Sequence, residues 1–518
     1  LTVRNSAGDW TLGASVSLAF GGVPVSGLSR QTAPNRVEMD RGWATEWVVN
    51  GPAGLEQGWD IPKRPAWAAE GDDLLITLHQ DGTLRAVAAE SDGKAMCVRD
   101  AQGREIWRYA GLRVTDATGR ELAASFEAQP GAGALGIRVS DADAVYPITV
   151  DPWVESAKLI ASDRQTNDHL GCSVALSANG RICAVGAYGS SPGGTAQAGA
   201  VYIFTNAAGT WTGVTNQAAK LLASDRQLSD KLGWSVALSA DGGVCAAGAY
   251  GSAGAVYIFT NAAGNWGGVS GESAKLVASD KVQGDHLGNA VALSSNGEIC
   301  AAGAFCAGQA GAVYIFKNAA GSWVGVSNQA TKLVSSDIQI ADNLGYSVAL
   351  SADGGICAAG APNSSPGGTN YASAGAVYMF KNTAGSWSGV SNQVTKLFAS
   401  NRQALDNLGS SVALSADGGI CAAGAPNSSP GGTNQAGAVY IFTNAAGSWS
   451  GVSYQATNLV ASDKQAFDKY GSAVALSSNG DVCAAGAPDS SPGQTDKAGA
   501  AYVNVLPVEN EYGWLVVG

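Results

Sequence analysis

The chain has 518 residues, of which 70 are glycine and only 14% are charged, and its formal net charge is −12. This length favours two domains, and the glycine content is typical of a turn-rich all-β protein. The acidic balance argues against nucleic acid and anionic membrane surfaces as partners. No apolar run approaches the length of a membrane span, and the start at Leu1 suggests a mature or trimmed product.

Residues 1–153 are expected to form an N-terminal β domain with a sandwich-like arrangement. Strand-like runs separated by glycine-rich turns support this expectation; they are residues 74–78, 83–88, 136–139 and 146–150. The sequence Asp151-Pro152-Trp153 is expected to mark the end of this domain, because proline interrupts strand pairing.

Residues 154–505 repeat one phrase six times, which in the fifth copy reads GSSVALSADGGICAAGAP. The copies begin at Gly171, Gly233, Gly288, Gly345, Gly409 and Gly471, which are 62, 55, 57, 64 and 62 residues apart. One loop, which follows the "AGA" phrase, accounts for all of this variation. A fixed frame with one loop of variable length predicts a repeated structural unit.

Each repeat predicts four short strands, which in the fifth copy cover residues 411–415, 420–425, 438–443 and 457–462. The turn Ala416-Asp417-Gly418-Gly419 is a strong hairpin signal between the first two. Four antiparallel strands repeated about a centre are the blades of a β-propeller. Residues 157–162 match the fourth strand, so we expect them to close the last blade beside residues 500–505. This predicts a six-bladed ring, with a seventh blade from the N-terminal domain as the alternative.

The repeats resemble FG-GAP repeats, which form the propeller of integrin α chains and occur in many bacterial secreted and surface proteins. The "FG" corresponds to Leu or Tyr followed by the six glycines above, and "GAP" is literal at Gly360-Ala361-Pro362 and in the next two repeats. The phrases at residues 50–58, 64–65, 116–120 and 146–152 resemble a domain that precedes repeats in large bacterial exported proteins. The resemblance implies a secreted or cell-surface location.

Many FG-GAP blades hold calcium in a DxDxDG loop between their first two strands. The corresponding turns here read SANG, SADGG or SSNG, which are too short and too poor in carboxylates for this ion. We therefore expect no cofactor at these hairpins.

Paired acidic residues recur between the fourth strand of one repeat and the first strand of the next. We expect each to cap a turn by accepting backbone N–H bonds, with a cation held by some of these loops as the alternative. The candidate metal ligands are Asp163, Asp168, Asp225, Asp230, Asp337 and Asp342.

Three other residue types recur or stand out. Six cysteines at one place in the second strand are expected to be reduced core residues, and a bridge between Cys172 and Cys183 is a less favoured alternative. One tryptophan recurs in each of five repeats and is expected to pack between blades, with a carbohydrate platform as the alternative; these are Trp211, Trp266, Trp323, Trp387 and Trp449. His169 and His286 are interpreted as solvated loop residues.

No unique cluster of acid, base and nucleophile appears, so the sequence predicts a protein that is not an enzyme. We expect a binding or structural protein of the cell surface, such as an adhesin, surface-layer or filament component, that contacts a protein or glycan and can self-associate. An exported carbohydrate-active hydrolase, lyase or lectin is the alternative.

The binding surface is expected at the end that carries the loops of variable length, where two short loops leave a notch. The candidate binding residues are Tyr250, Phe305, Asn363, Asn427 and Asp489. The tail, residues 506–518, fits no blade.

Overall fold

The computed structural model of the chain describes residues 2–5, 8–11, 15–16, 29–33, 36–51, 54–65, 73–79, 85–88, 93, 96–99, 105–128, 134–155, 159–206, 211, 216–251, 254–261, 266–318, 321–337, 339–382, 387–388, 392–444, 449–450, 454–491, 497 and 499–506. These residues form two compact units. The first comprises Leu1–Leu159 with Asn206–Thr215, and the second comprises Ile160–Thr205 with Asn216–Gly518.

The first unit is built from strands alone in its described part. They are β1 (Thr2–Asn5), β2 (Gly8–Thr11), β3 (Ser15–Val16), β4 (Ser29–Ala33), β5 (Arg36–Asp40), β6 (Thr45–Gly51), β7 (Gly54–Ile61), β8 (Leu74–His79), β9 (Arg85–Ala88), β10 (Met96–Arg99), β11 (Glu105–Thr115), β12 (Ala124–Ala128), β13 (Ala134–Val139) and β14 (Ile148–Glu155). One sheet has the order β4-β5-β6-β7-β14-β11-β10-β9, a second has the order β12-β13-β8-β3, and β1 pairs with β2.

The two larger sheets of this unit share one hydrophobic core. Ile76 and Leu135 from the smaller sheet pack in the same cluster as Trp59, Val114 and Val150 from the larger one. This agrees with the sandwich-like arrangement expected from the sequence.

The expectation that Pro152 ends strand pairing is wrong. Strand β14 continues to Glu155, and its pairing with β11 is irregular at this point, between Ala110 and Arg113. Its pairing with β7 involves only Ile148, Thr149 and Val150. Proline is tolerated here because the ladder is already interrupted beside it.

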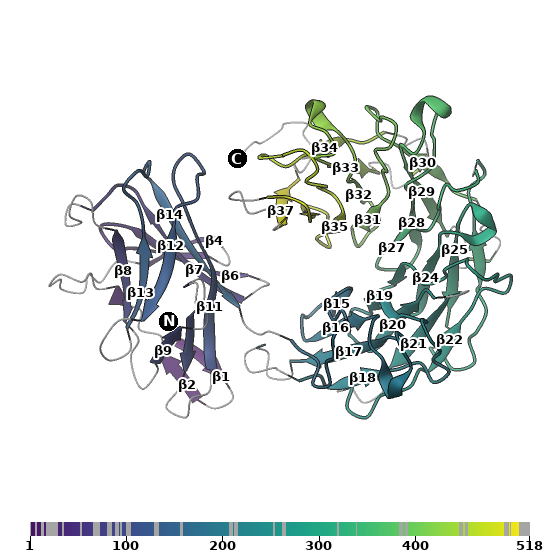
Figure 1. Cartoon of the computed structure of the whole chain (residues 1–518), viewed down its shortest axis with the longest axis horizontal. Helices are drawn as coiled ribbons and strands as arrows, with labels where there is room; N and C mark the ends of the chain where they lie inside the picture. Colours follow the sequence, from purple (N-terminus) through teal and green to yellow (C-terminus); the bar gives the residue numbers. More distant parts are fainter. Residues whose placement is uncertain are drawn as a thin grey trace. The chain divides into compact units, whose positions relative to one another are not determined.

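In its described part the second unit contains six small antiparallel sheets, each formed by strands that follow one another in the chain (Figure 1). Five described sheets have four strands: β15 (Val174–Leu176), β16 (Ile182–Ala187), β17 (Ala200–Thr205) and β18 (Ala219–Leu221); β19 (Leu232–Leu238), β20 (Val244–Ala249), β21 (Ala255–Thr260) and β22 (Ala274–Leu276); β23 (Val291–Leu293), β24 (Ile299–Ala304), β25 (Ala312–Lys317) and β26 (Thr331–Leu333); β27 (Ser347–Leu350), β28 (Ile356–Ala361), β29 (Ala376–Lys381) and β30 (Thr395–Leu397); β31 (Ser411–Leu414), β32 (Ile420–Ala425), β33 (Ala438–Thr443) and β34 (Thr457–Leu459). The sixth has three: β35 (Ala473–Leu476), β36 (Val482–Ala487) and β37 (Ala500–Val505).

The connections between the strands also follow the repeat. Short 3-10 turns lie in the loop between the second and third strands at η1 (Pro192–Gly194), η2 (Ala307–Gln309), η3 (Thr369–Tyr371) and η4 (Pro430–Gly432). The predicted hairpin at Asp417 is confirmed: Gly418 has a φ of 69°, and its N–H donates to Ser415 at 2.9 Å. Asp417 accepts from Ser415 and from the Gly419 N–H, so its carboxylate is used within the turn.

The glycines of the "FG" and "GAP" phrases meet between neighbouring sheets. A Cβ on Gly360 would lie 2.0 Å from the carbonyl oxygen of Gly409, which itself has a φ of 91°. The same contact recurs at four other junctions, at Gly186, Gly248, Gly303 and Gly424. Both glycines of the motif are therefore required by a close approach of two backbones.

Backbone hydrogen bonds also join neighbouring sheets at the end that carries the hairpins between the first and second strands. Five bonds of 2.8 Å link the hairpins in order, from Ala178 through Ala240 and onward to Ser478. Among the described residues no such bond joins the last hairpin to the first, and β37 pairs only with β36. Residues 159–162 form no strand, whereas Ala157 and Lys158 lie outside the described residues. Closure of the ring by this segment therefore stays a prediction.

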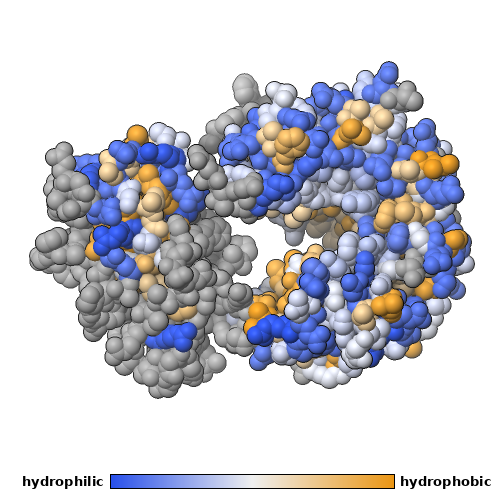
Figure 2. Space-filling model, in the orientation of Figure 1, coloured by the Kyte–Doolittle hydropathy of each residue, from blue (hydrophilic) through white to orange (hydrophobic). Residues whose placement is uncertain are grey.

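The core of the second unit lies between successive sheets. The Ala/Gly/Cys-rich second strands are largely buried, as Ile299–Ala304 is throughout. On the face turned to the viewer, apolar patches over these sheets are small and separated by hydrophilic atoms (Figure 2). Of the tail only Leu506 is described, and it packs against the last sheet.

The predictions for the cysteines and for four of the five tryptophans are confirmed in this core, whereas Trp211 is only half-buried and belongs to the first unit. Trp266, Trp323, Trp387 and Trp449 are fully buried and each donates its indole N–H to a hairpin glycine at 2.9 to 3.0 Å. This burial excludes those four as a carbohydrate platform. The six cysteines of the second strands are buried and form no disulfide, and Cys172 and Cys183 are not bridged.

Candidate functional site

The loop-bearing end of the second unit is defined by two kinds of connection. One joins the second to the third strand of a sheet, and the other joins the fourth strand of one sheet to the first of the next. In an antiparallel sheet both lie at the same end of the strands. Short parallel bridges, such as that between Gly254 and Leu287, hold these connections together between neighbouring repeats.

An unbroken series of aromatic rings crosses this end over the first four repeats. We call it the aromatic arc; it consists of His169, Tyr188, Trp234, Tyr250, His286, Phe305 and Tyr346. Successive ring centroids are 4.8, 5.0, 4.2, 5.2, 5.3 and 5.8 Å apart. The five inner rings are half-buried, while His169 and Tyr346 at the two ends are exposed. Such contacts contribute about 0.5–1.5 kcal/mol each beyond area burial.

The two candidate binding residues Tyr250 and Phe305 are joined in the arc by His286. The imidazole stacks on Phe305 with an interplanar angle of 11°, and its Nδ1 lies 2.9 Å from the carbonyl oxygen of Tyr250. His169 stacks on Tyr188 at 7° in the same way. The interpretation of His286 as a solvated loop residue is therefore wrong, because its ring is half-buried in the arc. His169 is exposed, as expected, although it stacks on Tyr188.

A second series at this end, which we call the amide arc, crosses the fourth to sixth repeats. It consists of Asn363, Asn407, Asn427 and Lys469. Asn407 donates to Asn363 at 3.2 Å, Asn427 donates to Asn407 at 2.6 Å, and Lys469 donates to Asn427. The candidates Asn363 and Asn427 thus take part in one polar series. Asp489 occupies the corresponding place in the last repeat and is half-buried.

The second aspartate of each pair caps a turn, as predicted. Asp168, Asp230, Asp285, Asp342, Asp406 and Asp468 each accept the backbone N–H of the residue three positions earlier, at 2.6 to 2.9 Å. Burial raises the pKa of Asp406 to about 6, because the charged carboxylate loses hydration that the bond from Gln403 restores only in part.

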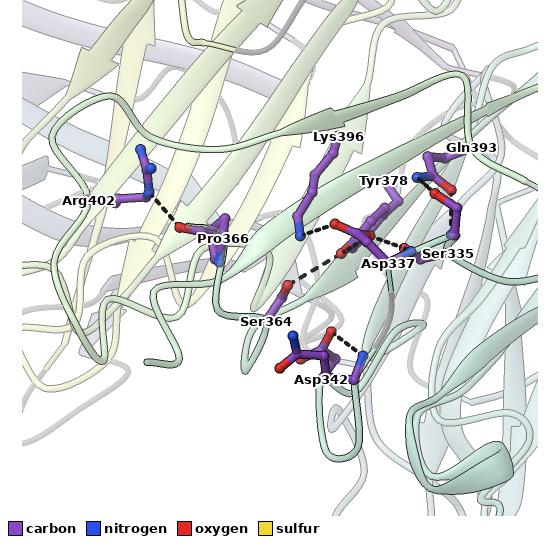
Figure 3. Close-up of polar contacts among 11 residues, drawn as sticks. Ser335, Asp337, Asp342, Ser364, Pro366, Tyr378, Gln393, Lys396 and Arg402 are labelled. Carbon is purple, nitrogen blue, oxygen red and sulfur yellow. Dashed lines mark hydrogen bonds and ion pairs between the residues drawn. The ribbon is translucent and has the colours of Figure 1, made fainter. Parts of the chain in front are cut away.

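The first aspartate has different partners from those expected. Asp163, Asp225, Asp280 and Asp337 each accept from a tyrosine hydroxyl on the third strand and pair with a lysine on the fourth strand of the following sheet. Figure 3 shows this cluster around Asp337, with Tyr378 at 3.2 Å and Lys396 at 2.9 Å. We call each such set a clasp, because it fastens the connecting loop to the sheet.

In each clasp, burial and pairing have opposite effects on the pKa of the aspartate. Burial raises the pKa of Asp337, but the bonds from Ser335 and Lys396 outweigh it and leave the pKa below its ordinary value. The same balance lowers the pKa of Asp163, Asp225 and Asp280. These carboxylates are therefore ionised and already paired.

The proposed metal ligands do not converge in this arrangement. Across the part of the chain that the structure describes, no group of three or more His, Cys, Asp or Glu side chains is placed to hold an ion. The six candidates are instead engaged by lysine, tyrosine or backbone N–H groups.

No described helix is long and apolar enough to cross a membrane.

The shortest variable loop exposes one clasp. In the second repeat a cavity of about 150 Å³ lies beside Gly251 and Gly254, and Asp225, Tyr257 and Lys275 line it. The longer loops of other repeats carry a 3-10 turn at this place, as at Pro430–Gly432. Neither Tyr250 nor Phe305 lines this cavity, so it is not the predicted notch, which stays a prediction.

Repeated four-stranded antiparallel sheets around glycine contacts define a β-propeller-like fold, and the sequence matches agree. Five segments match the FG-GAP repeat family: residues 153–204, 215–259, 271–316, 391–442 and 454–504. The chain thus carries five FG-GAP repeats on a β-propeller-like fold. The repeat between the third and fourth matches has the same sheet, β27-β28-β29-β30.

Many solved structures are similar to this chain, and two of them show how weak the overall similarity is. Hydrazine synthase of Kuenenia stuttgartiensis shares 12% identity at a TM-score of 0.41, covering 84% of this chain and 93% of that one. The Cps50 (Swd1) β-propeller domain of Myceliophteria thermophila shares 11% identity at a TM-score of 0.39, covering 84% and 99%. A search of curated proteins found no match.

Tyr250 and Phe305 were predicted from the sequence as binding residues, but the other rings of the aromatic arc were not. Trp234 and Tyr346 follow the "FG" glycine directly, and Tyr188 precedes a variable loop. A signal was present, since the places that hold aromatic residues in early repeats hold Ser or Pro in the last two. The sequence does not show that these positions contact one another, because the contacts form between the strand ends of neighbouring sheets.

Proposed function

We propose that this protein is a non-enzymatic binding protein whose loop-bearing end contacts a protein or glycan partner. The aromatic arc is the observation that carries this proposal. Seven rings gathered along one end, with exposed rings at both ends of the series, offer apolar contact area beside polar loops. We place the protein outside the cell or on its surface, where adhesion or assembly into a layer or filament would use such an end.

The chemistry of the carboxylates favours binding over catalysis. The aspartates at this end accept backbone N–H bonds or pair with lysine, as Asp337 does with Lys396. A carboxylate that acts as general acid or base has to reach the reacting group of a substrate. The paired aspartates instead stabilise the loops.

An array of glycans and extracellular proteins tests the proposal, probed with the intact chain with and without a chelator. We expect binders that tolerate the chelator and are lost in the Tyr250→Ser, Phe305→Ser double variant. The thermal unfolding curve of that variant shows whether the fold survives. Binding that is unchanged by these substitutions, or cleavage of an arrayed glycan, would contradict the proposal.

A further inference from the structure

Six residues at the loop-bearing end share an unusual backbone conformation. They follow the second aspartate of each pair directly and have φ between 56° and 62°; they are His169, Lys231, His286, Asn343, Asn407 and Lys469. We call them the αL series. Residues other than glycine seldom adopt this region, so the loop places these side chains at a fixed point of every repeat. None of the six is acidic, although the chain has a net charge of −12.

Two lysines of the αL series differ from the lysines of the clasps. The clasp lysines each pair with an aspartate, as Lys220 does with Asp163. Lys231 instead lies over the rings of Trp234 and Tyr250, at 5.8 and 5.0 Å from their centroids. Lys469 donates to the neutral side chains of Asn427 and Gln435. Within the described residues neither lysine forms an ion pair, so both retain a positive charge without a carboxylate partner.

The neighbours of these lysines are suited to sugars. Lys231 lies within the aromatic arc, whose rings offer apolar edges and faces for contact with a pyranose. Lys469 lies at the end of the amide arc, whose groups can donate and accept hydrogen bonds with hydroxyls. An ammonium group beside each adds a point of attraction for an anion. The combination matches a sugar chain that carries carboxylates.

We propose that the loop-bearing end binds an acidic polysaccharide, with carboxylates at Lys231 and Lys469 and sugar rings along the two arcs. This inference rests on the proposed function and names the chemical class of its ligand. A chain with one carboxylate on each sugar suits two separated lysines.

Polygalacturonate and its fully methyl-esterified form provide a matched pair of probes, because they share a backbone and differ in charge. The intact chain should bind polygalacturonate at least about tenfold more tightly, and this binding should weaken as salt is raised. The Lys231→Gln, Lys469→Gln double variant should lose at least about tenfold in affinity. Lys317→Gln, at the end of β25 on the hairpin end, should bind like the parent chain.

The outcomes separate this inference from the proposed function. Equal affinity for both polymers, or an effect of Lys317→Gln as large as that of the double variant, would overturn the acidic ligand. Equal binding of polyglutamate or single-stranded DNA would overturn the assignment to a sugar chain. If polygalacturonate does not bind but the array yields other partners that depend on Tyr250 and Phe305, the inference fails and the proposed function stands. If the array yields none, both fail.

Discussion

Asn401 and Asn458 occupy, in the fifth repeat, the places that an aspartate and a lysine hold in each of the first four. Asn458 lies opposite Tyr440 across β33 and β34, as Lys396 lies opposite Tyr378 across β29 and β30. Both members of the ion pair are therefore neutral in the same repeat. A single replacement would have left one charge partly buried without its partner, which is costly.

Restoring both charges should restore the clasp. The Asn401→Asp, Asn458→Lys double variant should raise the free energy of unfolding by up to about 1 kcal/mol, as expected for a partly exposed pair. Each single variant should gain less or lose stability, because it introduces one charge alone. Urea unfolding of the four proteins measures the coupling free energy. A coupling of zero would show that these two places do not interact.

Removing a clasp should produce a pH-dependent loss of stability. The pKa of Asp337 is lowered in the folded state, so its pair stabilises the protein above about pH 4 and is lost as pH falls through the folded pKa. Asp337→Asn should therefore cost up to about 1 kcal/mol at pH 7. The difference from the parent protein should shrink toward pH 2. A difference that is constant over this range would refute the role of the charge.

Asp406 should behave in the opposite way. Its pKa is raised from 3.8 to about 6, so the folded state binds the proton more tightly and loses stability as pH rises toward 6. Asp406→Asn keeps an oxygen that can accept from Gln403 and removes the buried charge. The variant should gain roughly 1–3 kcal/mol relative to the parent between pH 4 and 7. Unfolding by urea at several pH values measures this gain, and a pH-independent difference would contradict it.

Two glycines of the "GAP" phrase should respond differently to alanine. Gly360→Ala would place a Cβ 2.0 Å from the carbonyl of Gly409, so we expect a loss of roughly 3 kcal/mol or more. The matched variant Gly486→Ala meets only Ala473 at 3.8 Å and should cost less than about 1 kcal/mol. Thermal unfolding compares the two. Equal losses would contradict this expectation and show that another repeat packs on Gly486.

Much of the second unit followed from the sequence because its signals are local. The strands Ile420–Ala425 and Ala438–Thr443 match the predicted bounds, since turns and strand patterns are set by neighbouring residues. The predicted fourth strand was too long, ending at Leu459 rather than at residue 462. The end of the first unit was misjudged at Pro152, because an irregularity in the partner strand cannot be read from the proline itself.

The site was harder to predict because its contacts are distant in the chain. Asp337 and Lys396 form an ion pair although three strands separate them in the chain, so the sequence near either residue does not show the other as its partner. The interchange of His, Lys and Asn at one place suggested a solvated position for His286. The structure shows instead that the backbone conformation fixes this position in every repeat. The side chain contacts aromatic rings in the aromatic arc and amide groups in the amide arc.

Oxidative footprinting of the intact chain tests the binding end most directly, using whichever partner the array returns. Tyr346 is 42% exposed at the loop-bearing end. Leu176 is 61% exposed and directly precedes the first hairpin, so it serves as the probe of the hairpin end. We predict that the bound partner protects Tyr346 from hydroxyl-radical oxidation and leaves Leu176 unchanged. Protection of Leu176 with no change at Tyr346 would place the partner at the opposite end and contradict the proposed function.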